Sequence, residues 1–135
     1  MAGRYGMSFA AKMIQEGKYV EAVEEATRAA ARDDDDPAPL VERASAYAWL
    51  ERYPEAVADL EAAIALDETA GVLETDVVDD AYFSALLGAA KVEAKASMES
   101  ATKTLARYAG ILPGGRHLAD AAAWPDRLRT ASAGT

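Results

Sequence analysis

The chain has 135 residues, of which 51% are hydrophobic but only 7% aromatic, and its net charge is -9. Alanine therefore supplies much of the apolar content, which suits closely packed helices better than a β-sheet. The absence of cysteine excludes disulfide frameworks, cysteine-type zinc clusters and thiol nucleophiles. The acidic balance disfavours nucleic acid and membranes as partners. Because no apolar run approaches the ~20 residues of a membrane span, a soluble, cytoplasmic protein is expected.

Apolar residues recur at helical spacing along most of the chain. The first two helices are predicted over residues 4–16 and 19–32, with Gly17 as a left-handed cap between them. Asp36 is placed to cap the third helix, whose first turn tolerates Pro37. The remaining helices are predicted over residues 38–52, 54–66, 77–95, 97–109 and 117–124.

Two acidic stretches separate these helices. Asp33-Asp34-Asp35-Asp36 offers four adjacent carboxylates, but the mid-loop glycine and late glutamate of a helix–loop–helix calcium site are absent. A solvated capping loop is therefore predicted, and no metal or other cofactor is expected. Residues 67–80 add six further acids around Gly71, and this stretch is predicted to be an insertion or a lengthened junction.

Two parts of the chain are similar at an offset of 34 residues. Segments 18–25 and 52–59 share the order basic residue, Tyr, any residue, Glu, Ala, Val. A repeat of this length is one helical hairpin, which cannot bury its apolar face alone. Small residues are expected where the two helices of each hairpin cross, namely Ala10, Ala22, Ala44 and Ala56.

This repeat resembles the tetratricopeptide repeat (TPR) family, whose hairpins carry the pattern W-x2-L-G-x2-Y, then A-x3-F, then P. The pattern is clearest in residues 37–70, where it falls on Leu40, Arg43, Ala44, Tyr47, Ala56 and Leu60. Further matches lie in residues 3–36 and 82–115, the last with Pro113 in the proline position.

The resemblance implies an all-α fold, a right-handed array of about three TPR-like helical hairpins. It also implies a single domain over residues 1–135. Residues 117–129 are expected to fold back as a capping helix, because repeat arrays need a polar end for solubility.

In the TPR family the first helix of each hairpin lines a concave groove that holds the ligand. The resemblance places a largely apolar set of side chains there: Met7, Ala11, Ile14, Gln15, Val41, Ser45, Ala48, Trp49, Leu86 and Ala90. Chaperone-docking members use Lys, Arg and Asn at these positions to hold a terminal carboxylate, and none of these types is present. Trp49 is the expected anchor, with the alternative that it packs on the C-terminal helix or a neighbouring hairpin.

The resemblance therefore implies a protein-interaction module or scaffold that holds an apolar or amphipathic segment of another protein, with a basic flank attracted by the acidic first half. A self-assembling homo-oligomeric scaffold is an alternative, because residues 1–80 carry -12 and residues 81–135 carry +3. An escort chaperone for a secreted or aggregation-prone protein would use the same groove. No enzyme is expected, because phosphate-binding, dinucleotide and nucleophile motifs are absent and His117 is placed as a helix-start residue.

Overall fold

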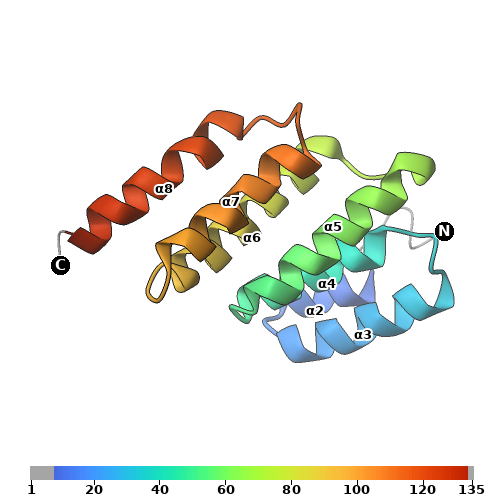
Figure 1. The fold of residues 1–135 in the computed structure, drawn as a ribbon. Coiled ribbons are helices and arrows are strands. Elements are labelled where there is room, and N and C mark those ends of the chain that lie inside the picture. The colour runs from blue at the N-terminus through green and yellow to red at the C-terminus, as the bar shows by residue number, and fades with distance from the viewer. Residues whose placement is uncertain (1–7, 134–135) are drawn as a thin grey trace. The chain divides into compact units, whose positions relative to one another are not determined.

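The computed structural model describes residues 8–133, and over this range the regular secondary structure is helical throughout. The chain divides into two compact units, residues 1–74 and 75–135 (Figure 1). The helices of the first unit are α2 (Phe9–Gln15), α3 (Tyr19–Arg32), α4 (Ala38–Trp49) and α5 (Tyr53–Ala70). Those of the second unit are α6 (Thr75–Glu93), α7 (Met98–Ile111) and α8 (Leu118–Ala133).

The first unit consists of two stacked hairpins, α2–α3 and α4–α5, in which each helix packs on the next along the chain. The four alanines expected at the helix crossings are all buried, with exposed fractions of 2% or less. Because alanine projects only a methyl group, the helix axes can approach closely there, and a larger side chain would overpack the contact. Val57 and Leu60 of α5 are among the largest fully buried side chains of this core.

The turn inside each hairpin has the same backbone in both repeats. Gly17 has the predicted left-handed conformation, with φ of 78°, and the N–H of Lys18 donates to the carbonyl of Met13 at 2.8 Å. Thirty-four residues later, Glu51 has φ of 58°, and the N–H of Arg52 donates to the carbonyl of Tyr47 at 2.8 Å. A side chain in this region is disfavoured, so the turn ends α4 at Trp49, three residues before the predicted end.

The predicted acidic insertion is mostly helical. Helix α5 continues to Ala70 and α6 begins at Thr75, so only residues 71–74 link the two helices. Gly71 adopts a left-handed conformation, with φ of 62°, at the end of α5. The carboxylate of Asp67 accepts hydrogen bonds from the N–H groups of Val72 and Leu73, at 2.7 and 3.1 Å, and so holds the linking residues against α5.

The second unit is the α6–α7 hairpin with α8 packed mainly against α7 and in part against α6. Its core contains Tyr82, Leu86 and Tyr108, each with an exposed fraction of 0%. At the α8 side, the buried residues are Ala90, Ala101, Leu105 and Leu128. Helix α8 runs beyond the predicted range with Pro125 inside it. Among the described helices, none is long and apolar enough to cross a membrane.

Candidate functional site

The predicted binding residues of the first unit lie on α2 and α4, which are in contact with each other. Within each helix they recur at spacings of three and four residues, so they share one side of the helix. All of them keep exposed or half-exposed side chains. We call this set the α2–α4 face: Ala11, Ile14, Gln15, Val41, Ser45, Ala48 and Trp49. Met7 lies outside the described residues.

A hydrogen bond fixes α2 against α4 beside this face. Ser8 caps α2, and its hydroxyl oxygen accepts from the N–H of Ala11 at 3.0 Å. The same hydroxyl donates to Oε2 of Glu42 at 2.7 Å. The first turn of α2 is therefore tied to α4, and the two rows of side chains keep a defined spacing.

Trp49 is the largest side chain of the α2–α4 face and has an exposed fraction of 63%. Its ring lies parallel to that of Tyr19, the first residue of α3, with 5.4 Å between the centroids and 4° between the planes. Trp49 therefore rests on the neighbouring hairpin through one side of its ring and still presents most of its surface to solvent. The exposed side of the ring is available to a ligand, as the predicted anchor requires. The contact with Tyr19 agrees with part of the alternative, in which Trp49 packs on a neighbouring hairpin.

Leu86 and Ala90, the predicted binding residues of α6, are not part of an exposed surface. Both have exposed fractions of 0%. Ala90 lies in the cluster formed with Leu105 of α7 and Leu128 of α8. The capping helix that the sequence predicts therefore covers Ala90 within the second unit.

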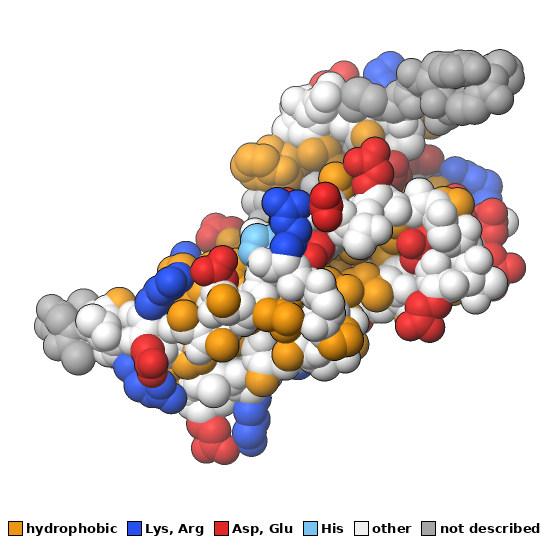
Figure 2. All heavy atoms as spheres, turned by 90° about the horizontal axis from the view of Figure 1, so that it is seen from above, with side chains coloured by type: hydrophobic (Ala, Val, Ile, Leu, Met, Phe, Trp, Pro, Cys, Tyr) orange, Lys and Arg blue, Asp and Glu red, His pale blue; other side chains and the backbone are white. Residues whose placement is uncertain are grey.

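The net charge of the protein lies entirely in the first unit. Residues 1–74 contain 16 acidic and 7 basic side chains, whereas residues 75–135 contain 7 of each. The predicted split of -12 and +3 becomes -9 and 0, because three acids of α6 belong to the second unit. Figure 2 shows charged side chains interspersed with exposed hydrophobic ones on the face that it draws.

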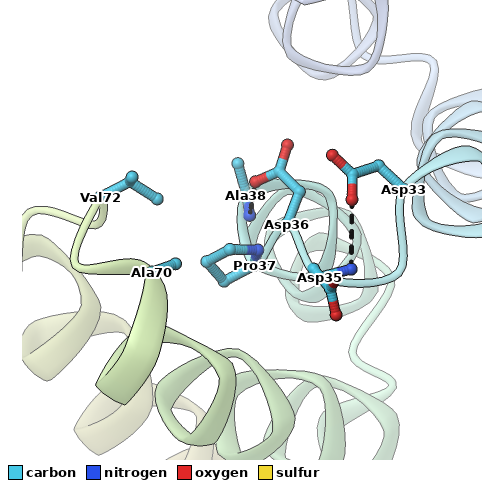
Figure 3. A pocket seen from close by; sticks show the side chains of 7 residues that line it. All are labelled: Asp33, Asp35, Asp36, Pro37, Ala38, Ala70 and Val72. Atoms are coloured by element: carbon cyan, nitrogen blue, oxygen red, sulfur yellow. Dashed lines mark hydrogen bonds between the residues drawn. The ribbon is translucent and has the colours of Figure 1, made fainter.

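The acidic loop between α3 and α4 borders an open pocket of about 500 Å³ within the first unit (Figure 3). Asp33, Asp35 and Asp36 form its polar side, and apolar groups including Ala70 and Val72 form the other. Oδ1 of Asp36 accepts from the N–H of Ala38 at 3.0 Å, although the N-cap residue of α4 is Pro37, one residue after the predicted Asp36. Oδ1 of Asp33 accepts from the N–H of Asp35 at 3.2 Å. The loop carboxylates thus stabilise the backbone that leads into α4.

No protein-family model and no curated protein matches the sequence. Two solved structures are similar over most of the chain. The second TPR domain of human RPAP3, in complex with the HSP70 peptide SGPTIEEVD, is 23% identical with a TM-score of 0.58, over 87% of this chain and 88% of that one. The first TPR of Spaghetti (RPAP3), bound to the HSP90 peptide SRMEEVD, is 24% identical with a TM-score of 0.54, over 92% and 89%.

The fold is TPR-like. The seven described helices and both structural neighbours confirm the predicted all-α array of helical hairpins. At this level of identity the likeness establishes the fold alone.

One departure of this TPR-like chain from the family pattern is an ion pair in the first unit. Arg43 stands where the pattern has leucine, and its guanidinium donates two hydrogen bonds to the Asp59 carboxylate at 2.8 and 2.6 Å. A third bond, at 3.1 Å, reaches the hydroxyl of Thr27 on α3. The hydrogen bonds to Asp59 raise the pKa of Arg43 above its usual value. The pair therefore connects α3, α4 and α5.

A second network, in the second unit, fixes the start of α8. The buried Asp79 of α6 accepts from the Tyr108 hydroxyl on one oxygen and from the N–H of Arg116 at 2.9 Å on the other. The Tyr108 oxygen also accepts from the N–H of His117 at 2.9 Å. A Cβ at Gly115 would overlap with the Tyr108 hydroxyl, so this glycine is needed for close approach.

His117 directly precedes α8, in agreement with the prediction of a helix-start residue. Its ring stacks on Phe83 at 4.6 Å, and its Nε2 lies 2.6 Å from Oδ1 of Asp80. The hydrogen bond with His117, followed by the charge of Arg116, lowers the pKa of Asp80. No local pattern indicates these partners, because Asp80 and His117 are 37 residues apart.

The ionisation of Tyr108 offers a direct test of this network. Burial, followed by the hydrogen bond to Asp79, raises the pKa of Tyr108 to about 12. Because the folded state holds this proton more tightly than the unfolded state, the associated stability is complete below pH ~10. It is lost as the pH rises toward ~12, at a cost of at most about 3 kcal/mol.

We expect ultraviolet absorbance titration to show a tyrosine ionisation step near pH 12, and Tyr108→Phe to abolish that step. Retention of the step in the Phe variant would contradict the assignment.

Proposed function

We propose that this protein is an interaction module that binds an apolar or amphipathic segment of another protein on its α2–α4 face. The observation that carries the proposal is the exposed ring of Trp49, held in place by Tyr19 beside small and aliphatic side chains. A rigid aromatic group of this kind loses little conformational entropy on binding and commonly dominates the affinity of an interface.

The structural neighbours support a peptide ligand in general, because each was solved in complex with a chaperone-derived peptide. The two peptides are acidic at their carboxyl ends, as their sequences show. The α2–α4 face contains no Lys, Arg or Asn, and the first unit carries a net charge of -9. An acidic terminus would therefore be repelled without being held, which favours an apolar or basic amphipathic segment.

The test is a selection of random peptides displayed on phage against the full chain, followed by calorimetric titration of the recovered peptides. We expect Trp49→Ala to weaken their binding by about tenfold or more, as for a central aromatic contact. Val92→Ala is the matched control, because Val92 is a comparably exposed residue of the second unit, at 55%. Equal affinities for the wild type and the Trp49 variant would overturn the proposal.

The peptides SGPTIEEVD and SRMEEVD provide a second comparison. We expect neither to bind above the background of an unrelated peptide, because the α2–α4 face offers no positive group to their carboxylates. Tight binding of either would place the ligand elsewhere on the chain.

A further inference from the structure

We infer that the partner segment places a lysine or arginine side chain on the open side of the Trp49 ring, next to the apolar contact. This inference rests on the proposed function and makes its ligand more specific. It follows from three observations: other aromatic rings of the chain already have cations over them, the cations near Trp49 are paired with other groups, and the charge of the first unit is negative.

Other half-buried aromatic rings of this protein already carry cations of their own. Arg52 lies over the ring of Tyr47, with 5.1 Å from Cζ to the centroid. Trp124 has Lys91 at 5.0 Å and Arg127 at 5.2 Å. Trp49 differs, because no Lys or Arg of the described residues lies over its ring. Tryptophan binds a cation more strongly than the other aromatic side chains do. The open face of the Trp49 ring can therefore bind a Lys or Arg side chain of a partner.

The cations that are close in sequence to Trp49 and Tyr19 are held by other groups. Lys18, which precedes Tyr19, pairs with Glu16 at 3.3 Å. Arg52 pairs with Glu55 at 2.7 Å in addition to its contact with Tyr47. Both bonds would have to break before either side chain could cover the indole. Among residues 8–133, a cation supplied by the partner therefore meets no competitor already in place.

The charge around the ring has the sign that a cation requires. Glu51 follows Trp49 by two residues and is exposed, and its side-chain carboxylate has no hydrogen bond or ion pair with any described residue. The whole first unit carries -9. Its field concentrates basic segments near this surface and speeds their encounter with it. The partner is therefore an amphipathic segment with at least one Lys or Arg beside its apolar residues, and an acidic segment is excluded.

The experiment uses a peptide recovered on the wild-type chain, prepared with its lysine free or with the lysine acetylated. Acetylation removes the charge while it retains the side-chain length. We expect acetylation to weaken binding to the wild type by about tenfold, of which the cation–aromatic contact is the larger part. With Trp49→Leu, which keeps an apolar side chain but has no aromatic ring, we expect a loss of twofold or less.

The two variants separate this inference from the proposed function. If acetylation weakens binding equally in the wild type and in Trp49→Leu, the cation does not sit on Trp49 and the inference is overturned. In that case the proposed function still stands, provided that Trp49→Ala reduces affinity. If Trp49→Ala leaves affinity unchanged, the proposed function and the inference both fail. Circular dichroism of each variant checks that the helices are retained.

Discussion

Replacing Arg43 by alanine is expected to lower the free energy of unfolding by about 3 kcal/mol. The reason is the carboxylate that remains, because Asp59 has an exposed fraction of only 7%. Without Arg43 this charge would stay in the interior of the first unit with no cation beside it. Urea denaturation followed by circular dichroism measures the change. We place the effect at the lower end for a buried pair, since the Arg43 side chain is 23% exposed.

The exposed pair Arg52–Glu55 is the control for this experiment. Its side chains are 55% and 40% exposed, so Arg52→Ala should cost less than about 1 kcal/mol. The double variant Arg43→Met with Asp59→Leu should be close to the wild type in stability, because apolar groups of similar size replace both charges. An Arg43→Ala variant no less stable than Arg52→Ala would show that the ion pair does not hold the first unit together.

Gly115→Ala is expected to destabilise the second unit by about 2–4 kcal/mol. The added Cβ would lie 2.7 Å from Cζ of Tyr108 and even closer to its hydroxyl, so the tyrosine ring would have to shift. That shift breaks the hydrogen bond to Asp79 and leaves a buried carboxylate with one partner fewer. Thermal and urea denaturation both report the loss.

The adjacent Gly114 is a matched control for Gly115. A Cβ at Gly114 would meet no atom within 4 Å, and neither glycine has a positive φ. Gly114→Ala should therefore be neutral or slightly stabilising, because alanine restricts the unfolded chain. Tyr108→Phe should also reduce the penalty of Gly115→Ala, because it removes the hydroxyl that the methyl group would meet. Equal penalties at the two glycines would refute the close contact.

Local signals were sufficient to predict most of the helices. The limits of α3 agree with its apolar spacing, and Gly17 has the predicted left-handed conformation. The N-cap of α4 is Pro37, one residue after the predicted Asp36. The end of α4 was missed because Glu51 occupies the left-handed position that glycine occupies in the first hairpin. The residue type of Glu51 does not indicate a left-handed conformation. Its position 34 residues after Gly17 does indicate one, because the two hairpins repeat at that offset.

The contacts that distinguish this chain depend on residues far apart in the sequence. Asp79 is 29 residues from Tyr108 and 37 from Arg116, so its role as their shared partner has no local signature. In the sequence Asp79 is one of six acids in a stretch predicted to be an insertion or a lengthened junction. The family pattern placed Leu86 and Ala90 on a binding surface, but their burial depends on how α6, α7 and α8 pack in the second unit.

The charge of the protein is unevenly distributed, because residues 1–74 carry all of the net charge and residues 75–135 are neutral overall. A cationic sensor chip or anion-exchange resin would capture the protein through that half, which also contains Trp49. Immobilisation through a tag at the carboxyl terminus, on a neutral support, would leave the ring accessible. Assays that ignore this orientation would underestimate affinity even for a genuine ligand.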